Sequence, residues 1–256
     1  IVSLLLCGGG TLCSFISYYY QNTIPLLMMA IGYTLLLFVS CWNVPKTDIA
    51  WWRYLVVALL LVAGDYSGIK AYNTTSLASA MLLVTTVSFW VAPIAWFVLK
   101  RKITLIQFFA ISLGIGGSAM IFVADGVEGN KWVGNILALI SAITYAFGTV
   151  FQEYLVHNDS VHIYIFRFAC GAAPFAWALS GPIEWKLMRD FHWCWQSVLL
   201  ILGYAFLLVI YNLCSPSLMQ FSDATTMNLS ILTSNFYSLG ISILAFGQKP
   251  SYLYLI

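Results

Sequence analysis

Four Asp, Glu, Lys or Arg side chains lie inside long apolar runs of this sequence and are the first candidates for chemistry: Asp65, Lys70, Glu153 and Arg167. Asp65 follows Arg53 by about 12 residues, which is roughly 18 Å along a helix and places the carboxyl group deep in a bilayer. An unpaired Asp at that depth costs about 2.5–3.5 kcal/mol on insertion scales, so it requires water, a partner or a proton. Asp65 is therefore either a cavity residue that binds substrate or carries a proton, or a polar group bonded to a neighbouring helix.

The other three ionisable residues have a competing explanation, because each lies near a predicted end of its apolar run. Long basic side chains near a helix end extend to the membrane interface, which would account for Lys70 and Arg167 without a functional role. Glu153 and Arg167 are both predicted to lie within about two helical turns of the same membrane surface. In the functional interpretation these groups contact a polar solute, and Lys70 attracts an anionic part of it.

Uncharged polar residues inside apolar runs extend this set. Asn228 and Tyr237 lie in the last long run, where such side chains commonly form hydrogen bonds between helices. The candidate substrate-binding residues are therefore Asp65, Tyr66, Lys70, Glu153, Arg167, Asn228 and Tyr237.

Patterns typical of enzymes, metal sites and nucleotide loops are missing from the sequence. The histidines His157, His162 and His192 form no HExxH motif, the six cysteines show no CxxC spacing, and no GxGxxG or Walker pattern occurs. Asp65 has no acidic partner at a similar depth in a neighbouring run. We therefore predict no catalytic residues, no metal and no cofactor.

Composition places the chain in lipid. Of its 256 residues, 61% are hydrophobic and 8% are charged, whereas a soluble domain carries about 25% charged residues. The net charge of +2 is too small to indicate nucleic-acid binding. A membrane-spanning helix needs about 20 apolar residues, and such runs occur at residues 1–17, 24–42, 54–72, 77–99, 105–123, 133–156, 161–179, 198–217 and 224–246. A tenth begins at Tyr252 and is cut off at Ile256, and we expect the natural protein to be longer.

Basic residues near the ends of these runs predict the orientation. Lys46, Arg53 and the cluster 100–102 flank even-numbered connections, whereas the first connection carries no charge. Because cytosolic loops are enriched in Lys and Arg, we expect these connections and both chain ends on the cytosolic side. The glycines of a GxxxG pattern, Gly64 and Gly68, predict close helix packing.

The fourth and ninth runs resemble each other, since both begin with small and hydroxylated residues. Superposing them aligns Ala78 with Ala224, Met81 with Met227 and Leu83 with Leu229. Related spans in matching places indicate a duplicated membrane protein whose halves face a shared cavity. We place the halves at residues 1–125 and 126–256.

Several segments resemble one transporter family. These are residues 3–8 (SLLLCG), 70–75 (KAYNTT), 134–146 (GNILALISAITYA), 152–154 (QEY), 228–230 (NLS) and 237–239 (YSL). Together they resemble the F branch of solute carrier family 35, within the drug/metabolite transporter superfamily. The resemblance implies an all-α membrane protein of ten transmembrane helices, the last one truncated here, in two inverted five-helix repeats.

The resulting expectation is a secondary transporter of a small polar or organic solute, nucleotide-derived by family analogy, that works by alternating access. The alternative is a non-transporting membrane scaffold or regulator that retains the fold, because positions where the family often has acids align here with Leu61, Ala63 and Val84. We expect a multi-pass integral membrane protein whose partners are a small solute and the lipid bilayer, without nucleic acid, and a homodimer is compatible with it. The sequence does not distinguish an organelle from the plasma membrane.

Overall fold

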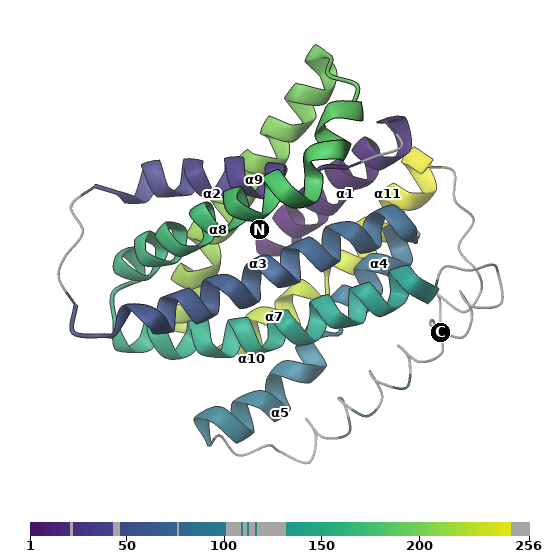
Figure 1. Cartoon of the computed structure of the whole chain (residues 1–256). Helices are drawn as coiled ribbons and strands as arrows, with labels where there is room; N and C mark the ends of the chain where they lie inside the picture. Colours follow the sequence, from purple (N-terminus) through teal and green to yellow (C-terminus); the bar gives the residue numbers. More distant parts are fainter. Residues whose placement is uncertain are drawn as a thin grey trace.

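The computed structural model describes residues 1–20, 23–42, 47–75, 77–100 and 132–246, together with positions 109, 112 and 116. Within these residues the secondary structure is entirely helical (Figure 1). The helices are α1 (Val2–Tyr20), α2 (Pro25–Ser40), α3 (Trp51–Thr74), α4 (Leu77–Val84), α5 (Val87–Leu99), α7 (Trp132–Asn158), α8 (Val161–Asp190), α9 (Trp195–Phe221), α10 (Ala224–Ile231) and α11 (Ser234–Phe246).

Apolar composition predicted most of these helices. Six stretches of the described helices are long and apolar enough to cross a membrane: Val2–Tyr20, Trp51–Thr74, Leu82–Leu99, Trp132–Asn158, Val161–Asp190 and Trp195–Phe221. Helix α2 is also apolar but shorter. The predicted runs at 105–123 and from residue 252 lie outside the described residues, apart from three isolated positions.

The fourth and ninth apolar runs, which we predicted as continuous helices, are each broken into two segments. The fourth run divides into α4, of 8 residues, and α5, of 13 residues, with Thr85 and Thr86 between them. The hydroxyl groups of these threonines donate to the carbonyl groups of Leu82 and Leu83 at 3.0 and 2.6 Å. Hydroxyl groups that bond nearby carbonyls compete with the regular helix pattern, and this accounts for the break.

The ninth run breaks at the corresponding place. Helices α10 and α11 have 8 and 13 residues, and Leu232 and Thr233 separate them. Here the first helix of the chain contributes to the break: Ser3 Oγ donates to the Ser230 carbonyl oxygen at 2.7 Å and accepts from Thr233 Oγ1 at 2.8 Å. Two broken helices of matching segment lengths therefore lie in the two halves of the chain.

Small residues bring α3 and α7 into close contact, so that they lie side by side in Figure 1. Ser141 Oγ donates to the Gly64 carbonyl oxygen at 2.7 Å. A Cβ atom on Gly68 would lie 3.0 Å from Ser141 Oγ, and one on Gly148 would lie 2.6 Å from Leu61. The packing role predicted for Gly64 and Gly68 is confirmed.

Helices α2 and α8 are bonded to each other near the start and in the middle of α2. The buried Glu184 carboxylate on α8 accepts from the backbone N–H groups of Leu26 and Leu27 at 3.0 and 3.1 Å. These donors belong to the first turn of α2, where they have no partner within the helix. Farther along, Trp177 Nε1 donates to Thr34 Oγ1 at 2.9 Å. Side chains of α8 therefore replace a local cap at the start of α2.

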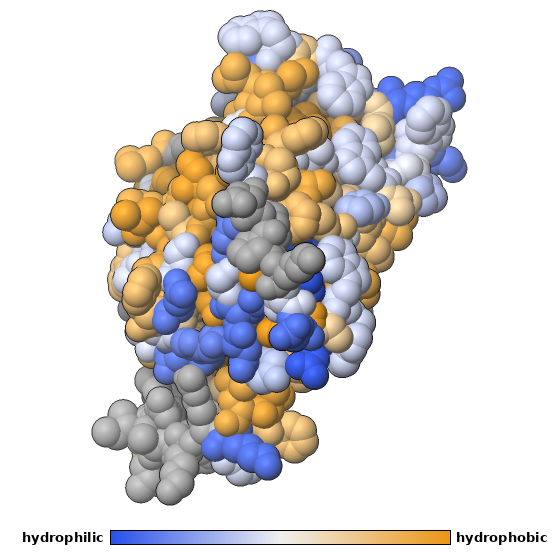
Figure 2. Space-filling view, turned by 90° about the vertical axis from the view of Figure 1, so that its left-hand side faces the viewer, coloured by the Kyte–Doolittle hydropathy of each residue, from blue (hydrophilic) through white to orange (hydrophobic). Residues whose placement is uncertain are grey.

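The molecular surface carries the features expected of a membrane protein. Apolar side chains form broad areas on the face seen in Figure 2, and the hydrophilic residues gather in a few clusters. Tryptophans near the helix ends are exposed, among them Trp42 (83%), Trp185 (66%) and Trp195 (74%). Indole rings prefer the boundary between lipid and water, which accounts for this placement.

Candidate functional site

A cavity of about 90 Å³ lies between α1, α2, α3, α4, α7 and α9. Helices from both halves of the chain therefore contribute to its wall. Its volume is enough for several water molecules, but it is smaller than the roughly 300–1,000 Å³ typical of small-molecule sites. In this conformation the helices leave only a small space between them.

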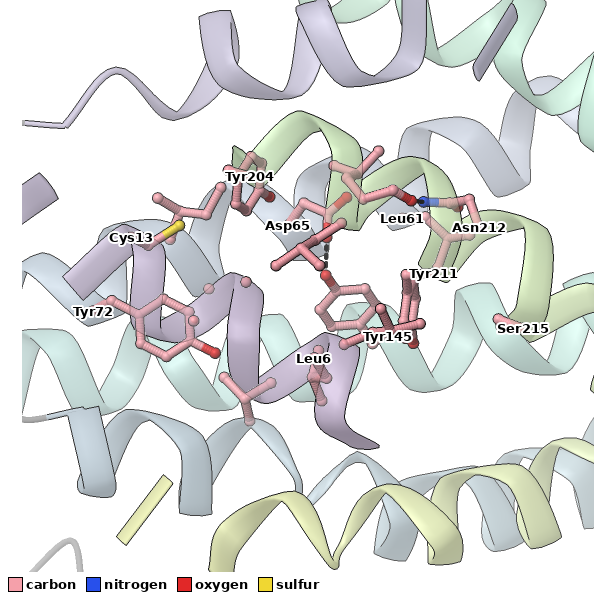
Figure 3. A pocket seen from close by; sticks show the side chains of 18 of the residues that line it. Leu6, Cys13, Leu61, Asp65, Tyr72, Tyr145, Tyr204, Tyr211, Asn212 and Ser215 are labelled. Carbon is pink, nitrogen blue, oxygen red and sulfur yellow. Dashed lines mark hydrogen bonds between the residues drawn. The ribbon is translucent and has the colours of Figure 1, made fainter. Parts of the chain in front are cut away.

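Asp65 is at the centre of the cavity wall (Figure 3). Tyr145 on α7 donates a hydrogen bond to Asp65 Oδ1, and Tyr33 on α2 donates one to Oδ2. The carboxylate of α3 is therefore held by hydroxyl groups from two other helices, one in each half of the chain. This arrangement supplies the partners that a carboxyl group deep in a membrane requires.

Tyrosine rings dominate the rest of the wall around Asp65. Besides Tyr33 and Tyr145, the cavity is lined by Tyr72, Tyr204 and Tyr211, and Figure 3 shows the last three on different sides of Asp65. Tyrosine offers an apolar ring face together with a polar hydroxyl group. The cavity can therefore stack a planar or apolar group while it hydrogen-bonds a polar one.

A second, uncharged polar group of residues lines the cavity on α7 and α9: Thr149, Gln152, Asn212 and Ser215. Asn212 Nδ2 donates to the Leu208 carbonyl oxygen at 2.9 Å, and Ser215 Oγ bonds Met227 Sδ at 3.2 Å. Gln152 is only 4% exposed, and its amide makes no hydrogen bond to any residue that the structure describes. Its polar atoms are therefore left for a ligand or water.

A family model described as SLC35F, solute carrier family 35, matches residues 1–256. The chain belongs to the F branch of solute carrier family 35. It is 27% identical to mouse solute carrier family 35 member F2 over 100% of this chain and 73% of that protein. The Xenopus tropicalis member F2 is also 27% identical, over 100% of this chain and 71% of its own length.

Two further comparisons concern a fungal relative and the fold. An uncharacterized solute carrier family 35 member of Schizosaccharomyces pombe is 25% identical over 80% of this chain and 42% of its own length. A solved crystal structure superposes with a TM-score of 0.67 at 14% identity, over 99% of this chain and 91% of that one, and so shares the fold. With its membrane-length helices, this family 35 member is a multi-pass integral membrane protein.

Among the predicted site residues of this solute carrier, Asp65 lines the main cavity and Asn228 lines a smaller one. The smaller cavity, of about 20 Å³, shares Tyr145, Thr149 and Tyr211 with the main one. Asn228 Nδ2 donates to the Ala224 carbonyl oxygen at 2.8 Å. Asn228 therefore lies next to the Asp65 cavity, and Tyr145 belongs to the wall that the two cavities share.

Lys70 and Tyr66 form a pair that does not line the main cavity. The Lys70 ammonium nitrogen lies 5.9 Å from the centroid of the Tyr66 ring, a cation–π distance. Tyr237 on α11 is 45% exposed and lines neither cavity. Their roles in substrate binding remain predictions.

Arg167 and Glu153 make contacts between helices outside the main cavity. Arg167 Nη1 donates to the Ile49 carbonyl oxygen at 2.8 Å, and its guanidinium carbon lies 5.2 Å from the Tyr54 ring centroid. Glu153 is 1% exposed, and its Oε2 accepts from the Ala224 backbone N–H at 3.0 Å. Glu153 therefore binds the start of α10, as Glu184 binds the start of α2.

Gln152 and the cavity tyrosines were not selected from the sequence, although helical spacing could have found part of the set. Tyr145, Thr149 and Gln152 are four and three residues apart, so they share one face of α7. Glu153 is the next residue and points to α10 instead. Among the described residues, no group of three or more His, Cys, Asp or Glu side chains could hold a metal ion.

Proposed function

We propose that this protein transports a small polar or organic solute across a membrane by alternating access, and that the Asp65 cavity is its substrate site. The observation that carries the proposal is the position of Asp65. Its carboxylate lies in a cavity walled by both halves of the chain and is bonded by Tyr33 of one half and Tyr145 of the other. A ligand that displaces the Tyr145 hydroxyl group alters a contact between the halves.

The contacts between helices support an inverted repeat. Helix α1 packs on α9 as α7 packs on α3, α2 packs on α9 as α8 packs on α3, and α4 packs on α11 as α10 packs on α5. If the helices of residues 1–125 correspond in order to those of residues 126–256, so that α1 matches α7, α2 matches α8 and α3 matches α9, each of these contacts made by a helix of one half has a counterpart made by the matching helix of the other. A pseudo-twofold relation between the halves accounts for the exchange.

The two broken helices also support this relation. Helix α4 contacts α11, and α5 contacts α10, so the two runs cross in opposite directions. Ser88 Oγ donates to the Asn228 carbonyl oxygen at 2.7 Å, and Thr85 Oγ1 donates to Asn235 Oδ1 at 3.0 Å. Breaks that meet at one crossing give each half a flexible point beside the substrate site, since Val84 and Thr85 line the two cavities.

The small volume of the cavity fits one stage of such a cycle. A cavity of about 90 Å³ is too small for most metabolites, so the helices must move apart for a solute to bind. Alternating access provides this movement without opening both sides at once.

The test is uptake into proteoliposomes. The purified protein is reconstituted, a broad metabolite mixture is added outside, and the contents of the vesicles are read by mass spectrometry. We expect at least one small solute to accumulate above protein-free vesicles and to saturate with concentration. If no solute accumulates in vesicles that contain folded protein, the transport proposal is wrong and the scaffold alternative takes its place.

A further inference from the structure

We propose that the substrate is an organic cation, which rests on the proposed transport function and narrows it to one chemical class. Among the described residues that line the main cavity, Asp65 is the only Asp, Glu, Lys, Arg or His. The formal charge of the described lining is therefore negative or, with Asp65 protonated, zero. A ligand with a positive group complements this lining, whereas a phosphate or carboxylate does not.

The basic residues Arg53 and Lys70 of α3 and Arg167 of α8 have other contacts. Lys70 lies over the Tyr66 ring, Arg53 Nη1 donates to Tyr154 Oη at 3.3 Å, and Arg167 is bonded to the Ile49 carbonyl. None of these residues lines the cavity. An anionic substrate would therefore enter a buried site with no cation to balance its charge, which is unfavourable in a low-dielectric interior.

Asp65 has the capacity to accept a further donor. A carboxylate offers about four lone-pair positions, and the two tyrosine hydroxyl groups occupy one on each oxygen. A protonated amine or amidine can bond to the remaining positions, and such charge-assisted bonds are stronger than neutral ones. Tyr33 and Tyr145 hold the carboxylate in a fixed orientation toward that donor.

The aromatic rings favour the same class of ligand. Tyr72, Tyr204 and Tyr211 lie on different sides of Asp65 (Figure 3), and Tyr33 and Tyr145 line the same cavity. The negative face of an aromatic ring attracts a cation, and groups of such rings recognise organic ammonium ions in other proteins. The combination of one carboxylate and several tyrosine rings therefore selects a positive charge carried by an organic body.

Gln152 gives the substrate a second feature. Its amide is 4% exposed, lines the cavity and has no hydrogen-bond partner among the described residues. Because the Gln152 side chain faces the cavity, a ligand group that pairs with its amide gains a hydrogen bond and therefore affinity. We infer that the cation also carries a carbonyl, amide or similar polar edge, which meets Gln152 while the positive group meets Asp65.

The test separates one cell metabolite extract by ion exchange into cationic, neutral and anionic fractions at neutral pH. Each fraction is offered to proteoliposomes that contain the full chain, and accumulation is read by mass spectrometry. We expect accumulation from the cationic fraction alone. Accumulation from only the neutral or the anionic fraction would overturn the charge assignment and leave transport standing, whereas accumulation from none would overturn both.

Variants then test the residues with the solute that accumulates. We expect Asp65→Asn to reduce initial uptake of the cation at least tenfold, and Gln152→Ala to raise its half-saturating concentration several-fold. Asp190→Asn is the matched control, because it removes an exposed carboxylate at the end of α8, and we expect unchanged uptake. If Asp65→Asn is well folded and transports the cation normally, Asp65 is not the group that selects the charge.

A charge placed at Gln152 gives a readout that does not depend on Asp65. Gln152→Lys adds a positive charge to the cavity wall and should exclude the cation, whereas Gln152→Leu has a comparable size without the charge. Thermal unfolding of both purified variants reports whether they are folded. Greater loss of uptake in Gln152→Lys than in Gln152→Leu supports a cationic substrate, and equal loss contradicts it.

Discussion

The hydroxyl group of Tyr145 donates a hydrogen bond to Oδ1 of Asp65, and this bond joins α7 to α3 beside the main cavity. The two residues are 80 positions apart in the sequence and lie in different halves of the chain. The bond therefore serves two purposes: it satisfies a carboxyl group buried in the membrane, and it contributes to the contact between the halves.

Removing that hydroxyl group should lower stability. We expect Tyr145→Phe to reduce the free energy of unfolding by about 1.5–3 kcal/mol, because a hydrogen bond to a charged group is lost. Thermal unfolding in detergent measures the change. Tyr204→Phe is the control, since Tyr204 lines the same cavity but its hydroxyl makes no hydrogen bond to a described residue. A loss of equal size in both variants would contradict a specific role for the Tyr145–Asp65 bond.

Glu184 should matter more for stability than its place on the flank of the bundle suggests. In Glu184→Ala the backbone N–H groups of Leu26 and Leu27 lose their acceptor, at a cost of about 1–3 kcal/mol for each buried donor left unpaired. We expect Glu184→Gln to retain part of the stability, because its carbonyl oxygen can still accept one bond. Denaturation of the purified proteins should show that stability decreases from the wild type to Glu184→Gln and then to Glu184→Ala. If Glu184→Ala is more stable than Glu184→Gln, Glu184 is not the cap of α2.

Two glycines of the long helices should respond oppositely to alanine. A Cβ atom on Gly134 would lie 2.5 Å from Thr74 Oγ1 and 3.1 Å from the Thr74 carbonyl carbon, so Gly134→Ala should destabilise the α3–α7 contact by about 1–3 kcal/mol. A Cβ atom on Gly181 would meet no described atom within 4 Å. Alanine there should stabilise α8 by up to about 1 kcal/mol. Melting temperatures of the two variants test the difference, and a stabilised Gly134→Ala protein would contradict the close contact.

The orientation of the chain can be tested by labelling. Lys100 follows α5 and is exposed, and the basic cluster that it begins predicts the cytosolic side. A cysteine at Lys100, in a chain whose exposed Cys41 is replaced by serine, should react with an impermeant maleimide only from the cytosol. Asp190→Cys, on the opposite predicted face, should react only from the other side. If Lys100→Cys reacts only from outside and Asp190→Cys only from the cytosol, the predicted orientation is wrong.

Most helices could be predicted from the sequence because an apolar run of membrane length has few alternatives in lipid. The breaks at Thr85 and Thr233 could not, since hydroxyl groups interrupt a helix only when the carbonyl groups they bond are in the right place, and similar residues elsewhere leave helices intact. Ser67 Oγ, for example, bonds the Ala63 carbonyl within an unbroken α3.

The candidate site shows the same division. Asp65 could be selected because a deeply placed charge is costly wherever it lies in a membrane. Glu153 is equally acidic, yet it binds the backbone of α10, and the neutral Gln152 beside it enters the cavity. Which of two adjacent residues faces a cavity depends on the rotation of α7 about its axis, and the packing against α3 fixes that rotation. The sequence shows which residues share a face of the helix, but it does not show which face points to the cavity.

The contact of Ser3 with the break between α10 and α11 constrains how the molecule is assembled. Ser3 Oγ and the Ser230 carbonyl oxygen belong to residues 227 positions apart, so α1 can meet this partner only after the helices between them in the sequence have been made. Until then the Ser230 carbonyl oxygen, which also accepts from Thr233 Oγ1 at 2.8 Å, lacks the hydrogen bond from Ser3. Since long-range contacts form slowly, closure of α1 on α10 and α11 should be a late step of folding in the membrane.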